Sequence, residues 1–504
     1  MFACIPTAVV EGVDGLAVHV EIKTGPGLPA MNIIGMPDTS CREATDRVRA
    51  ALLSSGLDWP QIRLTVNLSP SGVRKTGAGF DLAIALGVLV VSEQLTPESV
   101  QGLGALGELG LDGSLRPVNG MVALAHAVPA GRVIVPDAQG SSVAAVRPGE
   151  AISARSLREV FDALSGEGAP LALATTSPHD PSDDEPRLEL AEVRGQMLAR
   201  RALEIAAAGG HHLLMVGPAG AGKSMLAARL PALLPDLDLD EAVSVTKVHS
   251  VAGARIPDSG LLRRPPFRAP HHGASAVALI GGGSHTIRPG EISMASNGVL
   301  FLDEMGEFPV AVLEALRQPL EEGVVRVARA NSSAVMPARF QLVGAMNPCP
   351  CGEARPGRTC RCNDVARARY ARRLSGPLLD RFDLRIEVEP PDPHLLIGES
   401  PHETTAVVAH RVALAREIAH GRGLRCNAEL AARDLDTLAP LTSDARRLIE
   451  ATLLRGLLSG RGVRRVRTVA RTVADLAGCD GPVGEEAIAT AMALRATPFS
   501  VVGA

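Results

Sequence analysis

The segment 217–224 constrains this chain more than any other part of its sequence. It follows an apolar run at 212–216 and precedes a predicted helix at 225–234. A strand, G-x-x-x-x-G-K-[ST] and a helix form the context of a phosphate-binding loop. Its glycines let backbone N–H groups turn towards a phosphate, and the helix N-terminus adds a positive dipole end. The alternative is a glycine-rich turn that only starts a helix. The predicted nucleotide-binding residues are Gly217, Pro218, Ala219, Gly220, Ala221, Gly222, Lys223 and Ser224.

A second segment supplies the acids that a magnesium nucleotide requires. The apolar run 298–302 has the character of a buried parallel strand and ends in Asp303 and Glu304. We expect Lys223 to reach the β- and γ-phosphates, and Ser224 and Asp303 to bind Mg²⁺. Glu304 would position or deprotonate the attacking water.

A third predicted strand, 340–345, ends in Met346 and Asn347. An amide at that edge can contact the γ-phosphate or the attacking water, so Asn347 is the predicted sensor 1 residue. The alternative is a polar turn residue that merely ends the strand.

Length and composition set wider limits. With 504 residues, two or three domains are expected. The net charge of -4 excludes a global basic field, so nucleic-acid binding would have to use local patches. The longest apolar run, 82–91, has about half of the ~20 residues that a membrane span needs, and the N-terminus lacks the pattern of a secretory signal. These features predict a cytoplasmic protein without membrane association.

The pattern along the chain divides it into four parts. Residues 1–163 alternate short strand-like runs with helices, and 164–187 form a linker rich in Pro, Ser and acidic residues. Residues 188–390 carry the nucleotide motifs. Residues 391–504 are predicted to be mainly helical.

Several long motifs point to a family: 266–272, 279–283, 289–292, 297–304 and 375–383. They closely resemble the magnesium-chelatase-like AAA+ ATPases, and nearly the whole chain resembles the ComM/YifB-type members. The resemblance implies ATP and Mg²⁺ as cofactors and a homo-oligomer, a hexameric ring. It also implies helicase activity on single-stranded or branched DNA, namely branch migration that helps to integrate imported strands during natural transformation.

The resemblance also specifies the fold class and the state of the N-terminal domain. It implies an α/β AAA+ P-loop core, a helical C-terminal lid, and an α+β N-terminal domain like the Lon protease (ribosomal S5 domain 2-like). By alignment, Gly79 occupies the position of the Lon nucleophile and Val122 that of its lysine. Without a hydroxyl and a base there is no acyl chemistry, so this domain is expected to serve binding or assembly.

Two arginines take roles from the same resemblance. Arg381 matches the arginine finger that enters the neighbouring subunit's site. Arg461 matches the sensor 2 arginine of the lid, which would reach the γ-phosphate of its own subunit. Other arginines near Arg461 leave that match uncertain by a residue or two, and a solvated basic helix face is the alternative.

A hairpin is predicted around 330–332, just before the third strand. The family places such a hairpin in the pore of the ring, where Arg326 and Arg329 would follow a DNA backbone through ionic contacts. An ordinary surface hairpin is the alternative. We take His271 and His272, in the glycine- and proline-rich stretch 250–290, as structural or DNA-facing residues.

Four cysteines form the pattern C-x-C…C-x-C: Cys349, Cys351, Cys360 and Cys362. In a reducing compartment such a cluster favours metal ligands over disulfides, and Zn²⁺ with four thiolates is the natural choice. The alternative is a loop of free thiols.

The nucleotide motifs also permit two other functions. One is a chelatase-type motor that drives metal insertion into a porphyrin partner, against which the N-terminal domain argues. The other is a remodeller of a protein partner. Stimulation of ATP hydrolysis by forked or single-stranded DNA would separate the DNA motor from both.

Overall fold

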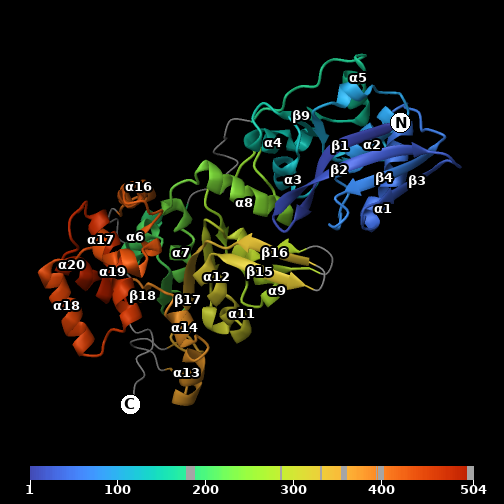
Figure 1. The fold of residues 1–504 in the computed structure, drawn as a ribbon. Helices are drawn as coiled ribbons and strands as arrows, with labels where there is room; N and C mark the ends of the chain where they lie inside the picture. Colours follow the sequence, from blue (N-terminus) through green and yellow to red (C-terminus); the bar gives the residue numbers. More distant parts are fainter. Residues whose placement is uncertain are drawn as a thin grey trace.

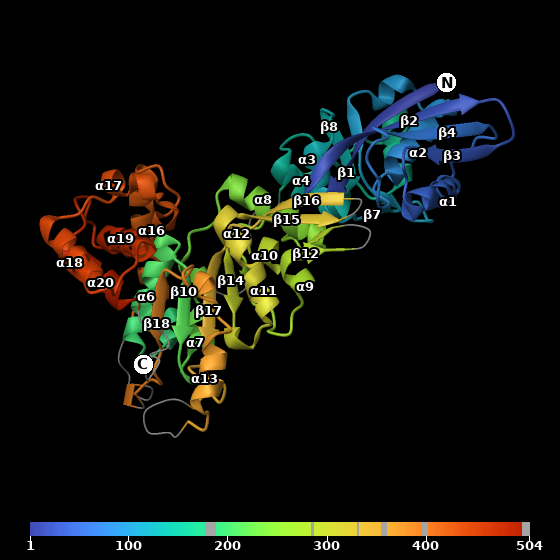
Figure 2. The same cartoon turned by 60° about the horizontal axis from the view of Figure 1, so that its bottom comes forward.

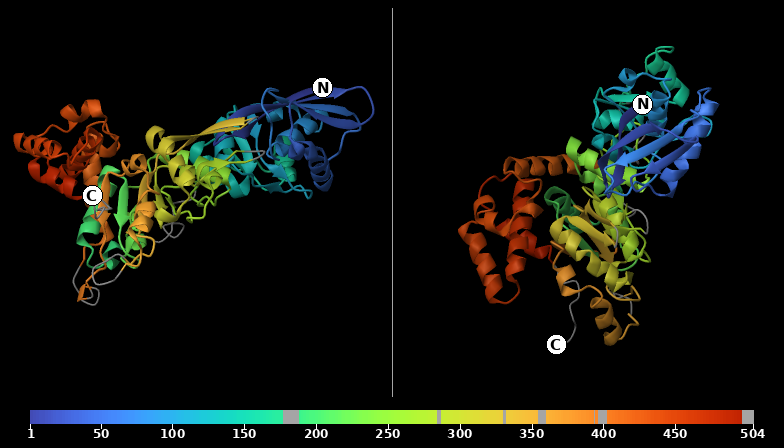
Figure 3. Two further views of the ribbon diagram at one scale, coloured as in Figure 1. Left: turned by 90° about the horizontal axis from the view of Figure 1, so that it is seen from below. Right: turned by 45° about the vertical axis from the view of Figure 1, so that its right-hand side comes forward.

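The structure is a computed structural model that describes residues 1–176, 188–283, 287–329, 332–353, 360–392, 394–395 and 402–495. These form three bodies in a row (Figures 1 and 3). A parallel-sheet core lies between an N-terminal α+β body and a C-terminal helical body. Among the described residues, no helix combines the length and apolar character that a membrane span requires.

The N-terminal body begins with a four-stranded sheet in the order β1-β2-β4-β3. Its strands are β1 (Phe2–Glu11), β2 (Asp14–Gly25), β3 (Ala30–Ile34) and β4 (Arg63–Ser69). Alternate residues of β2 are fully buried, as expected for a sheet with one covered face. The covering helix α2 (Asp81–Val91) is buried all round, with α1 (Thr39–Ser54) packed against it.

A parallel three-stranded sheet completes this body. It comprises β5 (Leu103–Ala105), β8 (Arg132–Pro136) and β9 (Ala151–Ala154), with the hairpin β6 (Glu108–Leu109) and β7 (Leu115–Arg116) beside it. The helices are α3 (Met121–Ala127), α4 (Gly140–Val146) and α5 (Leu157–Ser165).

The start of the predicted linker 164–187 belongs to the N-terminal body. Leu173 pairs with Ile152 of β9, and the Ala174 N–H bonds to the Ala151 carbonyl at 2.9 Å. Residues 177–187 lie outside the described part of the chain.

The core is a five-stranded parallel sheet in the order β11-β14-β17-β10-β18. Its strands are β10 (Leu213–Val216), β11 (Phe267–Arg268), β14 (Val299–Leu302), β17 (Gln341–Met346) and β18 (Leu384–Glu387). Every residue of β10, β14 and β17 is buried, which explains their apolar runs. The strand order changes direction at β10, and ligands of open α/β sheets bind at such a switch point.

Short helices surround this sheet (Figure 2). They are α6 (Met197–Gly209), α7 (Lys223–Ala227), α8 (Leu239–Ala252), α9 (Ala276–Ile280), α10 (Glu291–Met294), α11 (Val310–Ala315), α12 (Arg317–Glu322), α13 (Asp364–Ala371) and α14 (Gly376–Leu379). The hairpins are β12 (Gly281–Gly282) with β13 (Arg288–Pro289), and β15 (Val324–Arg329) with β16 (Ser332–Pro337).

The N-terminal body contacts the core through α8 and the β15–β16 hairpin. Lys247 of α8 pairs with Asp14 at 3.1 Å, and the Gly120 N–H bonds to the Ser250 carbonyl at 2.9 Å. The tip of the β1–β2 hairpin lies against β16, because a Cβ added to Gly12 would stand 3.1 Å from the Ala334 Cβ.

The C-terminal body is helical, as the sequence predicts. It contains α16 (Thr405–Gly421), α17 (Leu435–Leu438), α18 (Ser443–Leu454), α19 (Gly460–Leu476) and α20 (Glu485–Ala493). Helices α16 and α19 both pack on α6 of the core. Within α19, Arg471 is 1% and Asp475 2% exposed, and their side chains bond at 3.0 Å.

We predict that Asp475→Ala destabilises the C-terminal body. It removes the partner of the buried Arg471 guanidinium and a 2.7 Å hydrogen bond from Asn427. Breaking a buried pair from one side typically costs about 3–5 kcal/mol. Urea unfolding of the full chain measures the loss of stability, with proteolytic cleavage within the C-terminal body as the readout. Asp480→Ala, at an exposed position, is the matched control. Equal stability of the two variants would contradict the prediction.

Candidate functional site

The phosphate-binding loop lies between β10 and α7 at the switch point of the sheet. Gly217 is required by packing, since a Cβ there would stand 2.1 Å from the Val388 carbonyl oxygen. Gly220 and Gly222 have φ of +79° and +89°, and Cβ atoms built on them meet no other atom within 4 Å. The loop is therefore an open cradle, made by glycines in a conformation that other residues rarely adopt.

Lys223 is the first residue of α7 and its ammonium group is buried in the loop. It donates to the carbonyls of Gly217 at 2.6 Å and Pro218 at 2.9 Å, and to Asn347 Oδ1 at 3.2 Å. Burial lowers the pKa of Lys223, against the opposing influence of the nearby Asp303 and Glu304 carboxylates. The structure thus joins the predicted phosphate-binding lysine to the predicted sensor.

Ser224 and Asp303 meet across the same site, where the Ser224 hydroxyl donates to Asp303 Oδ2 at 2.6 Å. A hydroxyl and a carboxylate are the hard oxygen ligands that Mg²⁺ prefers. The loop, Asp303, Glu304, Met346 and Asn347 line a cavity of about 370 Å³. Its donor set and glycine cradle suit a magnesium nucleotide, which would supply the phosphoryl group to be cleaved.

Glu304 occupies a left-handed backbone conformation, with φ 47° and ψ 43°. Its Oε2 lies 3.2 Å from Nδ1 of His272, whose ring centroid is 4.0 Å from that of His271. His272 follows β11, the neighbour of β14 in the sheet, so both side chains lie at the carboxyl edge. This contact of His272 was not expected from the sequence. The only indication in the sequence was the position of His272 soon after β11. A strand of two residues leaves almost no hydrophobic pattern by which to recognise it.

Arg381 follows α14 and is absent from the lining of this cavity. It forms an ion pair with Glu321 of α12. The next turn is anchored by Asp383, which pairs with Arg465 of α19 and accepts the His212 N–H at 3.1 Å. Burial alone would raise the pKa of Asp383, but the His211 ring, 3.7 Å away, and the charge of Arg465 lower it well below its usual range.

Arg461 lies in the first turn of α19, near Arg381. Burial lowers the pKa of Arg381 most, and the positive charge of Arg461 lowers it further. It is exposed and is absent from the lining of the phosphate cavity of its own chain. The role of Arg461 as the sensor 2 residue of its own subunit stays a prediction. Four neighbouring arginines of α19 instead make contacts inside the chain: Arg464, Arg465, Arg467 and Arg471.

The predicted DNA-binding arginines lie on β15. Arg326 is exposed, and its Nε is 3.3 Å from Glu322 Oε2. The backbone of Arg329 pairs with Ser332 at the end of the hairpin, and its side chain lies outside the described part. The four cysteines collect between the end of β17 and the start of α13.

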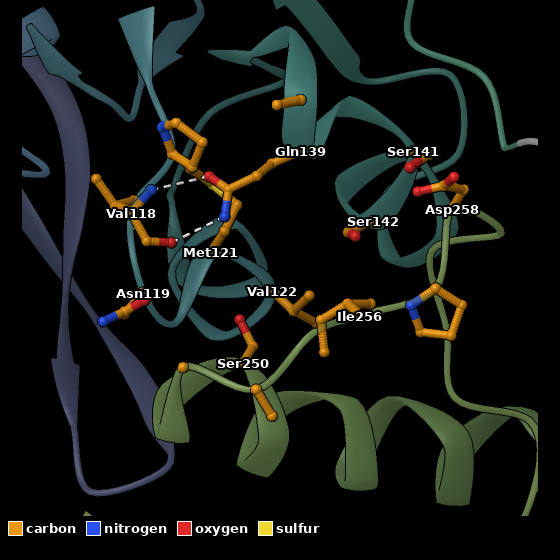
Figure 4. Close-up of a pocket in the computed structure, with 15 residues that line it drawn as sticks. Val118, Asn119, Met121, Val122, Gln139, Ser141, Ser142, Ser250, Ile256 and Asp258 are labelled. Atoms are coloured by element: carbon orange, nitrogen blue, oxygen red, sulfur yellow. Dashed lines mark hydrogen bonds between the residues drawn. The ribbon is translucent and has the colours of Figure 1, made fainter. Parts of the chain in front are cut away.

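The two positions that align with the Lon nucleophile and lysine line two cavities of the N-terminal body. Gly79 lines one of about 320 Å³, within that body. Val122 lines another of about 190 Å³, between α3 and the end of α8 (Figure 4). In this second cavity Val122 lies near Ser250 and Ile256 of the core, while Gln139 closes a pair of hydrogen bonds with the Val118 backbone. The two positions offer neither a hydroxyl nor an amine.

Family models match three segments of the chain. The family model described as "Magnesium chelatase, subunit ChlI" matches residues 189–395, "Subunit ChlI of Mg-chelatase" matches 20–139, and "Magnesium chelatase, subunit ChlI C-terminal" matches 402–495.

Three relatives are similar over nearly their full length. An uncharacterised protein of Mycobacterium tuberculosis is 44% identical over 97% of both chains. The uncharacterised protein YifB of Salmonella typhimurium is 41% identical over 94% of this chain and 93% of its own. Competence protein ComM of Haemophilus influenzae is 40% identical over 96% of both. This chain therefore belongs to the YifB and ComM family of magnesium-chelatase-like AAA+ proteins.

Proposed function

We propose that this protein is an ATP-hydrolysing ring motor that acts on single-stranded or branched DNA, in a role related to competence. Family membership implies ATPase activity with ATP and Mg²⁺. The observation that carries the proposal is the phosphate cavity. There Lys223 donates a hydrogen bond to Asn347, and Ser224 donates one to Asp303. The name of ComM, a competence protein, supports the link to DNA.

Within each chain, we assign roles by position in the cavity. Lys223 and the loop amides would bind the phosphates, and Ser224 with Asp303 would hold Mg²⁺. Glu304 would orient or deprotonate the attacking water, and Asn347 would position it. His272 would hold the Glu304 carboxylate in the orientation that this step requires.

Two further groups would act between subunits. Arg381 and Arg461 lie near each other and away from the cavity of their own chain. Both would therefore approach the nucleotide of a neighbouring chain in the ring. An arginine finger typically supplies about 10³–10⁵ in rate.

DNA would be held at the β15–β16 hairpin by ionic contacts from Arg326 and Arg329. The same hairpin touches the N-terminal body near Gly12. Forked or single-stranded DNA that leaves the ATPase rate unchanged, while a protein or porphyrin partner raises it, would favour the chelatase or protein-remodelling alternatives.

We predict that Arg381→Ala lowers kcat for ATP hydrolysis by about 10³-fold or more while nucleotide binding persists. Lys223→Ala, in contrast, should lose both ATP hydrolysis and nucleotide binding, because this variant lacks the lysine's phosphate contacts. Oligomers that mix the two variants should recover activity. Each Lys223→Ala subunit still presents Arg381 to a neighbouring Arg381→Ala subunit, whose cavity is intact. Steady-state ATPase assays across mixing ratios measure this. Arg446→Ala, at an exposed site on α18, is the control. Mixtures with no recovered activity would contradict action in trans.

We predict that His272→Ala lowers kcat by about 10- to 10²-fold, because the Glu304 carboxylate loses its anchor. KM for ATP should stay within about twofold, since His272 is absent from the cavity lining. His272→Gln, which keeps a hydrogen-bond donor, should recover part of the rate. His271→Ala serves as the neighbouring control. A change in KM without a change in kcat would count against a role through Glu304.

We predict that Arg326→Ala with Arg329→Ala weakens DNA binding and lowers the slope of log affinity against log salt by about 1.4, at ~0.7 per lost phosphate contact on a single strand. Fluorescence anisotropy with a labelled single strand, repeated across salt concentrations, measures the slope. The control is Arg433→Ala with Arg447→Ala, two exposed arginines of the C-terminal body. An unchanged slope would exclude the hairpin as the DNA contact.

A further inference from the structure

The cysteine cluster lies beside the nucleotide site but takes no part in it. Its four Sγ atoms all lie within 4.8 Å of one another. Cys349 is 3.3 Å from Cys351 and 3.6 Å from Cys360, and Cys351 is also 3.6 Å from Cys360. A disulfide would need about 2.05 Å between two sulfurs, so none of these contacts is a disulfide. Four sulfurs at mutual contact need an explanation.

Tetrahedral metal coordination explains this spacing. With Zn–S bonds of ~2.3 Å, the sulfurs of a Zn–S₄ site stand about 3.8 Å apart. The shortest distances here are slightly less, as expected of four side chains grouped around one point. We propose that Cys349, Cys351, Cys360 and Cys362 bind one structural zinc ion.

The surroundings suit such a site. Zn²⁺ with four thiolates carries a net charge of −2, which needs compensation nearby. The Arg367 guanidinium, on the first turn of α13, lies beside the Cys360 sulfur. The site is closed by four protein ligands and leaves no open position, which is typical of structural and not catalytic zinc.

The zinc ion would join two segments that both reach the nucleotide site. Cys349 and Cys351 follow Asn347 at the end of β17, and Gly352 turns back against Asn347, so that a Cβ there would lie 3.7 Å from its Nδ2. Cys360 and Cys362 lead into α13. The metal therefore fixes the start of α13 to the sensor strand.

Helix α13 and the residues that follow it also contact the turn after Glu304. The buried Tyr370 packs on Gly306, two residues after Glu304, and its hydroxyl lies near the Asn347 backbone. Arg373 adds to this contact. It donates to the Gly306 carbonyl at 2.5 Å and forms an ion pair with Glu307 at 3.1 Å. Zinc would thus brace Asn347 and the turn after Glu304 together. This role rests on the proposed ATPase function; the binding of zinc does not.

Metal analysis of the full chain tests the site. Plasma mass spectrometry of protein purified without chelator should give about one zinc per chain. Cys360→Ser should reduce the content to below about a tenth, whereas Cys479→Ser, at an exposed cysteine outside the cluster, should leave it unchanged. Wild-type protein refilled with Co²⁺ should show the intense bands of tetrahedral Co²⁺–thiolate. Zinc well below one per chain with no Co²⁺ spectrum, or iron with inorganic sulfide instead, would overturn the proposal.

The bracing role has its own readout. Removing zinc from the wild type with a chelator, then restoring Mg²⁺, should lower kcat about tenfold and speed amide exchange in α13, and added Zn²⁺ should reverse both effects. Bound zinc whose removal leaves amide exchange in α13 unchanged would refute the brace while leaving the metal site standing. An inactive zinc-replete wild type would instead count against the proposed function.

Discussion

Parallel pairing of β10 with β17, in the register that sets Val216 opposite Met346, is the constraint on which the nucleotide site depends. Carboxyl ends of parallel strands meet at one edge of the sheet, so the loop after β10 and the residue after β17 must adjoin. The contact of Lys223 with Asn347 follows directly. Pairing of β14 with β17 brings Asp303 to the same edge, where it meets Ser224. Three strands thus place residues separated by more than 120 positions in one cavity.

The sequence was sufficient to predict these strands because buried parallel strands are short apolar runs bounded by polar residues. The runs 212–216, 298–302 and 340–345 correspond to β10, β14 and β17 with ends that differ by about one residue. The predicted helix 225–234 was too long, since α7 ends at Ala227 and a separate 3₁₀ turn covers Pro231–Leu233. Pro231 lacks the N–H that a continuing helix would use, which accounts for the break.

Contacts across the core and between bodies could not be predicted in the same way. His272 reaches Glu304 because β11 pairs with β14, and β11 is too short to leave a periodic signal. Lys247 meets Asp14 across 233 positions of sequence, at an interface that no local pattern marks. The position of Arg461 depends on how the helical body packs on α6. The family motif assigned Arg461 to the nucleotide of its own subunit, but a motif carries no information on that packing.

The ion pair of Arg381 with Glu321 bears on whether the finger is free to act on a neighbour. Arg381 is 15% and Glu321 55% exposed, so water competes for the pair on one side. Pairs of this kind contribute about 0–1 kcal/mol, whereas an arginine finger typically supplies about 4–7 kcal/mol of transition-state stabilisation. The ion pair with Glu321 would therefore cost little against the gain from the proposed finger role. Glu321 precedes Glu322, which pairs with Arg326 of the hairpin, so the end of α12 carries the partners of both arginines. In the proposed motor, an Arg381 that leaves Glu321 would change the charge beside the hairpin, and this shared helix end would give nucleotide and DNA contacts a physical route to influence each other.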